Sequence, residues 1–95
     1  MPAYIIAMVN IKDAEKYQEY AKRAGPANAK YGSRFLVRGG KKHTLEGDIP
    51  FQRIVVTEFP DVEAARKFYQ SVEYQEARKH RVGAADFNMV IVEGA

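Results

Sequence analysis

The sequence predicts an α+β domain in which four antiparallel strands carry helices on one face, in the order βαββαβ. Three observations lead to this fold class. Short apolar runs are rich in β-branched and aromatic residues, the segments between them have apolar residues three and four apart, and capping or turn residues separate the two kinds of segment. This order is that of a ferredoxin-like sandwich. A chain of 95 residues has room for one hydrophobic core, so we expect residues 1–95 to form a single domain.

The first half of the chain predicts a strand, a helix and a second strand. Residues 3–11 (AYIIAMVNI) are too short and too evenly apolar for an amphipathic helix, and their side chains favour a buried strand. Asp13 can cap the helix that follows, and we expect a kink or break at Gly25-Pro26 because proline has no backbone N–H. Residues 34–38 (RFLVR) predict a strand that the next two glycines stop or bulge.

The second half predicts two more strands with helical turns between them. The run QRIVVTEF is apolar and β-branched, and Pro60 ends it. Asp61 can cap a helix whose apolar residues recur at helical spacing, and Ser71 can cap further turns. In chain order the predicted elements are strand 3–11, a helix from residue 14 to 32, strand 34–38, a loop over 41–51, strand 52–59, a helix from residue 62, helical turns over 73–82 and strand 86–92.

Apolar side chains occupy both faces of the predicted first and last strands. A strand with one wet face alternates apolar with polar residues, whereas residues 3–11 and 86–92 are apolar at both odd and even positions. The helices can cover only one face of the sheet, and no chain is left to cover the other. The sequence therefore predicts a homodimer in which the open sheet faces of two copies meet.

Composition excludes several kinds of function. The chain has no cysteine, which excludes disulfides, iron–sulfur clusters and thiol chemistry and fits a cytoplasmic location. With two histidines on different elements and no dinucleotide or phosphate-loop motif, we expect no metal and no cofactor. The third strand lacks the aromatic residues of an RNA-recognition sheet, so we expect no nucleic-acid partner. No apolar run is long enough to cross a bilayer, so we expect no membrane partner.

The candidate site residues carry carboxylate, guanidinium and phenol groups. Glu58 projects from an apolar strand face, where desolvation would make it a general acid or base, whereas a cross-strand partner such as Arg34 would make it structural. Arg81 shares a helical face with core residues, and its partner would be Glu58, Asp86 or the carboxylate of a ligand. The other ligand-binding candidates are Arg38, Gly39 and Gly40, which form an anion-binding or merely structural turn, and the tyrosines Tyr69 and Tyr74.

Several motifs resemble those of a known family. They are YQEY (17–20), RFLVRGG (34–40), LEG (45–47), VVTEFP (55–60), residues 64–69, EYQ (73–75) and Arg81. In this order, and over nearly the whole chain, they are similar to domain-of-unknown-function family 1330. The resemblance implies a protomer of the dimeric α/β-barrel group, which includes cofactor-free monooxygenases, isomerases and dechlorinating enzymes. It carries no residue role, and Ser33 departs from the second glycine that often precedes RFLVRGG.

Two functions of different classes follow. The first is the binding of a small, anionic organic molecule between sheet and helices, where Arg38 or Arg81 holds the anion and Glu58 carries a proton in cofactor-free oxygenase-type or isomerase-type chemistry. The second is a non-catalytic homodimeric interaction or ligand-sensing module. A fully packed interior, with Glu58 and Arg81 both paired internally, would favour the second. Whether the protein is an enzyme stays open at this stage.

Overall fold

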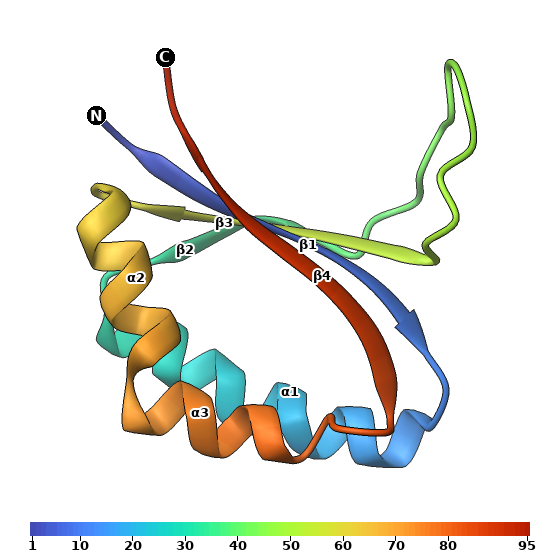
Figure 1. The fold of residues 1–95 in the computed structure, drawn as a ribbon, viewed down its shortest axis with the longest axis horizontal. Helices are drawn as coiled ribbons and strands as arrows, with labels where there is room; N and C mark the ends of the chain where they lie inside the picture. Colours follow the sequence, from blue (N-terminus) through green and yellow to red (C-terminus); the bar gives the residue numbers. More distant parts are fainter.

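The computed structural model describes residues 1–95 and confirms the predicted fold class. All neighbouring strands pair antiparallel in the order β2-β3-β1-β4, which is the ferredoxin-like arrangement. Figure 1 shows the helices on one side of this sheet. The elements are β1 (Ala3–Ile11), α1 (Ala14–Lys30), β2 (Arg34–Arg38), β3 (Arg53–Phe59), α2 (Val62–Gln70), α3 (Val72–Lys79) and β4 (Ala85–Glu93).

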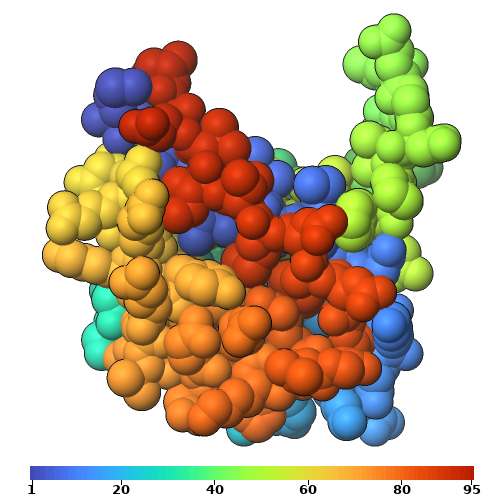
Figure 2. All heavy atoms as spheres, viewed as in Figure 1, coloured from blue at the N-terminus to red at the C-terminus, as the bar shows by residue number.

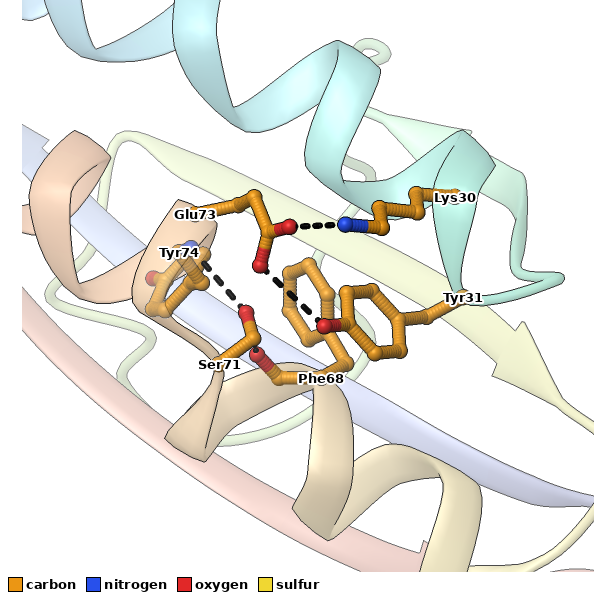
Figure 3. Close-up of polar contacts among 6 residues, drawn as sticks. All are labelled: Lys30, Tyr31, Phe68, Ser71, Glu73 and Tyr74. Carbon is orange, nitrogen blue, oxygen red and sulfur yellow. Dashed lines mark hydrogen bonds and ion pairs between the residues drawn. The ribbon is translucent and has the colours of Figure 1, made fainter.

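Each helix begins after the capping residue that the sequence predicts. The side chains of Asp13, Asp61 and Ser71 each accept a hydrogen bond from a backbone N–H three residues further on. Caps of this kind contribute about 1 kcal/mol each to stability. Ser71 also ends α2, because its hydroxyl donates to the carbonyl of Phe68 at 2.7 Å while it accepts from the N–H of Tyr74 at 3.1 Å (Figure 3). No helix is long and apolar enough to span a membrane.

The expected stop of β2 at Gly39-Gly40 is confirmed, whereas the break that was one alternative at Gly25-Pro26 does not occur. Helix α1 runs without a break through Pro26, which is exposed, so the carbonyl of Lys22 that proline leaves without an N–H partner lies on the solvent side. β2 ends at Arg38, directly before the glycine pair, and its bulge lies at Leu36 within the strand. There the extra residue places Phe35 and Val37 opposite successive residues of β3, so that the two side chains turn to opposite faces of the sheet.

The sheet has one face beneath the helices and one open face. In β1 the odd-numbered residues up to Val9 are buried in the core, whereas Ile6 on the other face is only partly buried. Val90 lies opposite Ile6, and Val90 and Val92 are 49% and 43% exposed. The chain therefore leaves one apolar sheet face without a cover, as the strand pattern predicts. The apolar residues of this open face are Tyr4, Ile6, Met8, Val37, Ile54, Val56, Val90 and Val92.

A long connection, here called the arm, joins β2 to β3 over residues 39–52 and contains no helix or strand. Figure 1 shows it rising on the side of the sheet opposite the helices, and Figure 2 shows the molecule hollowed between the arm and the two chain ends. Asn10 fastens its base, donating to the carbonyl of Pro50 and accepting from the N–H of Gln52, both at 2.8 Å. Leu45 is 95% exposed. The arm is therefore held to β1 at its base, and the rest of it projects beside the open face.

A polar clamp joins the end of α1 to the start of α3. The Glu73 carboxylate accepts hydrogen bonds from Lys30 and from the hydroxyl of Tyr31, the latter at 3.1 Å (Figure 3). The bond from Lys30 lowers the pKa of the Glu73 carboxyl below its ordinary value of 4.5. The clamp thus joins the two helices through the Glu73 carboxylate, whose pKa is lower in the folded chain than in the unfolded chain.

Replacing Glu73 by glutamine tests this clamp. Because the pKa of Glu73 is lower in the folded chain, its ionised form stabilises the fold above the unfolded pKa, and this contribution is lost as pH falls through the folded pKa. We expect E73Q to be less stable than wild type at neutral pH and the gap to close as pH falls below 4.5. Denaturant unfolding across this pH range measures the gap. The matched control is E63Q, because Glu63 forms only an exposed pair with Lys67 at 3.9 Å, and its stability should stay close to that of wild type. A stability difference between E73Q and wild type that does not change with pH contradicts the prediction.

Candidate functional site

A partly enclosed cavity of about 70 Å³ lies between the sheet and the helices. One water needs about 10–15 Å³ of such space, so the cavity holds about five water-sized groups. Most of its wall is apolar or aromatic, as is usual for small-molecule sites. The larger side chains that line it are Tyr17 and Tyr20 from α1, Phe35 and Arg38 from β2, Arg53 from β3, Phe68 from α2, Tyr74 from α3, and Phe87 and Met89 from β4.

Three tyrosines form part of the cavity wall on the helix side. The hydroxyls of Tyr20 and Tyr74 lie 3.0 Å apart, and the ring centres of Tyr17 and Tyr20 lie 5.6 Å apart. Burial raises the pKa of Tyr20 far above its ordinary value, and the neighbouring Tyr74 adds to the rise. Burial also raises the pKa of Tyr17, although the positive charge of Arg53 opposes it. These two phenols therefore stay protonated at neutral pH and serve as neutral hydrogen-bonding groups.

Arg81 is buried against this wall without an acidic partner. It is 8% exposed, and its Nε has no hydrogen-bond partner. Its Nη2 lies 3.4 Å from the hydroxyl of Tyr74, and its guanidinium carbon lies 3.8 Å from the ring centre of Phe87. Asp86, one predicted partner, pairs instead with Lys12 at 3.3 Å. The positive charge behind the cavity wall is therefore not neutralised by any carboxylate of the chain.

Glu58 lies on the open face, on the other side of the sheet from the cavity. It stands opposite Tyr4 of β1, whose side chain points away from the helices. Its Oε1 accepts a hydrogen bond from Nε of Arg34 at 2.7 Å, and the register of β2 and β3 sets these two residues directly opposite. The expectation that Glu58 shares one cavity with Tyr74 and Arg81 is therefore wrong, because its strand position turns it to the face without helices.

Two more arginines border the cavity near β2 and β3. The guanidinium carbon of Arg38 lies 4.0 Å from the ring centre of Phe35, and that of Arg53 lies 5.9 Å from the ring centre of Tyr17. The Nε of Arg53 is buried without a partner, and its Nη2 reaches only the carbonyl of Arg38, at 3.4 Å. No aspartate, glutamate or histidine lines the cavity, so its charged lining is entirely positive. Arg53 is a residue that the sequence analysis missed.

The remaining candidates lie outside the cavity. Gly39 has a φ of 73° and contacts the guanidinium of Arg53, whereas Gly40 is exposed on the arm. Tyr69 lines a separate groove beside β4, although its ring centre lies 5.4 Å from that of Tyr74. The structure thus brings Arg38 and Tyr74 to the cavity wall and Arg81 behind it, and it leaves Gly40 and Tyr69 apart from them.

Solved structures from several bacteria share this fold. A protein of unknown function from Rhodopseudomonas palustris is 24% identical over 99% of this chain and 82% of its own, with a TM-score of 0.79. SnoaB, a cofactor-independent oxygenase from Streptomyces nogalater, is 10% identical over 99% of this chain and 93% of its own, with a TM-score of 0.63. HapK from Hahella chejuensis is 12% identical over 98% and 92%, with a TM-score of 0.66. At these identities the likeness establishes the fold alone. The search of curated proteins gave no match.

A family model gives a closer assignment. The family described as Domain of unknown function (DUF1330) matches residues 2–95. The matched range contains the cavity, the arm and the open face, together with the RFLVRGG and EFP motifs on which the resemblance was based. The chain therefore belongs to the DUF1330 family.

Proposed function

We propose that the protein binds a small, anionic organic molecule in the cavity between sheet and helices. One observation carries the proposal: Arg81 is buried behind a wall of tyrosines with no carboxylate of the chain beside it. A buried charge is costly unless it is paired, and the lining adds two more cations and no acid. An anionic ligand would supply the missing negative charge. The proposed ligand-binding residues are Arg38, Tyr74 and Arg81.

The cavity offers little acid–base chemistry of its own. Its lining has no carboxylate or imidazole, and burial keeps the phenols of Tyr17 and Tyr20 protonated. Glu58, paired with Arg34 on the other face, has no route to a ligand here. Cofactor-free oxygenase-type or isomerase-type chemistry in this cavity would therefore begin from a ligand that is already an anion, with the arginines stabilising its charge. The fold shared with SnoaB supports such chemistry by analogy only.

We also propose that two copies of the chain join through their open faces. The open face is a continuous apolar surface over β1, β3 and β4, with Val90 and Val92 about half exposed. Surfaces of this kind are typical of protein interfaces, and a two-fold axis would place the same residues on both sides. The pair between Glu58 and Arg34 on this face supports the alternative function, a homodimeric interaction or sensing module without catalysis.

The absence of cysteine supports a cytoplasmic location.

Filling the cavity tests the ligand proposal. Ala21 on α1 lines the cavity, and a leucine there would occupy much of its volume, whereas Ala29 on the same helix is exposed. We expect the small anions propionate and pyruvate to shift the amide NMR resonances of cavity-lining residues in the wild type and in A29L. In A21L the affinity should fall by about tenfold or more because the space is filled. Shifts confined to the arm, binding that persists in A21L, or no shift with either anion would contradict the proposal.

A further inference from the structure

We propose that Arg53, held against Gly39, is the primary contact for the ligand's anionic group, and that the ligand is a short oxocarboxylate or hydroxycarboxylate. This inference rests on the proposed function and names the ligand class and the recognition residue. It is carried by the packing of Gly39, by the unpaired Nε of Arg53 and by the size of the cavity.

Gly39 leaves the space in which the Arg53 guanidinium lies. A Cβ built on Gly39 would meet three atoms first, and all three belong to that guanidinium. Gly39 also has a φ of 73°, a conformation that favours glycine. Gly47 on the arm has the same φ of 73°, yet a Cβ there would meet nothing within 4 Å. A side chain at residue 39 would therefore collide with the Arg53 guanidinium, whereas a side chain at residue 47 would collide with nothing.

The guanidinium of Arg53 has hydrogen-bonding capacity left over. No ion pair of the chain involves it, its Nε is buried without a partner, and its Nη2 makes a long bond of 3.4 Å to the carbonyl of Arg38. Its charge and a hydrogen bond also act on the phenol of Tyr17 and oppose the rise in the pKa of that group. Arg53 stands on the same face of β3 as Val55, beneath the helices, and it lines the cavity. The planar guanidinium of arginine suits a carboxylate, so a ligand carboxylate in the cavity would give this unpaired cation an opposite charge and a partner for the donors that face the cavity.

The rest of the cavity limits what the carboxylate can be attached to. A space for about five water-sized groups admits a ligand of about six heavy atoms without movement of the walls. The paired hydroxyls of Tyr20 and Tyr74, 3.0 Å apart, can donate to a second oxygen, and Arg81 lies behind them. A short chain with a carboxylate and one carbonyl or hydroxyl oxygen has this size and these groups. Pyruvate is the simplest probe of this class, and pyruvamide is its neutral isostere.

The Nε–Hε cross-peaks of the arginines in ¹H–¹⁵N NMR spectra give a direct test. We expect pyruvate to shift the cross-peak of Arg53 and to bind at least about tenfold more tightly than pyruvamide, since a charged hydrogen bond is lost in the amide. Gly39→Ala should displace the guanidinium and weaken pyruvate binding by about tenfold, whereas Gly47→Ala, with the same strain but no such contact, should leave the affinity within about twofold. Arg53→Met should lose the preference for pyruvate over pyruvamide.

Three outcomes would overturn this inference. They are equal affinities for pyruvate and pyruvamide, unchanged pyruvate binding in the Gly39→Ala variant, and the absence of any pyruvate binding. If pyruvate shifts cavity residues equally well in Arg53→Met, the proposed cavity site stands and only the role of Arg53 fails. If propionate also gives no cavity shifts in the wild type and in A29L, the proposed function fails together with this inference.

Discussion

Arg81→Met is expected to raise the free energy of unfolding while weakening the binding of anions. Methionine keeps an unbranched apolar chain beside Phe87 and removes a buried charge that no carboxylate balances. Replacing a buried ion pair by well-packed apolar residues of similar volume is often neutral or stabilising by about 1–4 kcal/mol, and an unpaired buried charge has no attraction to lose. The stacking of the guanidinium on Phe87 and Tyr20 offsets part of this, since cation–π contacts contribute about 0.5–2 kcal/mol. We therefore expect a net gain of about 1–2 kcal/mol.

Urea unfolding and an NMR titration with propionate measure the two effects separately. Arg66→Met on the exposed side of α2 is the control, and its stability should stay within about 0.5 kcal/mol of wild type. In Arg81→Met we expect propionate affinity to fall by about tenfold. A variant that loses more than about 1 kcal/mol of stability yet binds propionate normally would show that Arg81 is a structural anchor of α3 and would favour the module without catalysis.

Val90→Asp is expected to convert the proposed homodimer into monomers. Val90 is 49% exposed in the single chain, so an aspartate there costs the folding of the monomer little. In the dimer the carboxylate would be desolvated against the apolar open face of the other copy, and symmetry places the substitution in the interface twice. A penalty of about 4 kcal/mol raises the dissociation constant by about a thousandfold.

Light scattering at micromolar concentration measures this change in mass. Val72 lies on α3, on the helix side of the molecule, and is 76% exposed, so Val72→Asp is the matched control and should leave the dimer intact. A wild-type chain that is monomeric, or a Val90→Asp variant that stays dimeric, contradicts the open-face dimer. Circular dichroism of both variants confirms that the fold is kept.

The fold could be predicted in detail because its determinants are local. Asp13, Asp61 and Ser71 start the helices, and the apolar pattern of residues 3–11 shows that β1 presents apolar side chains to both faces of the sheet. Pro26 misled the prediction because the cost of a proline in a helix depends on whether the freed carbonyl faces water. That orientation is set by tertiary packing and is not readable from residues 25 and 26 alone.

The site was harder to predict because it depends on which face of the sheet the helices cover. The alternation of β3 correctly grouped Glu58 with Ile54 and Val56, but this group points to the open face. The same rule, applied to the other parity, would have found Arg53 as a charged residue on the face of Thr57. The sequence shows which strand residues share a face of the sheet. Only the strand register and the positions of the helices show which of the two faces borders the cavity.

The position of β1 in the middle of the sheet has a consequence for how the protein is made. β1 pairs with β3 on one side and with β4 on the other, and Tyr4 of β1 faces Val92 of β4. During synthesis an apolar strand therefore leaves the ribosome before either of its neighbours exists. Contacts between such distant parts of a chain slow folding, because a long loop must close before they form. The nascent chain thus exposes the apolar residues 3–11 until β3 and then β4 have been translated, so the sheet can be completed only when nearly the whole chain has been made.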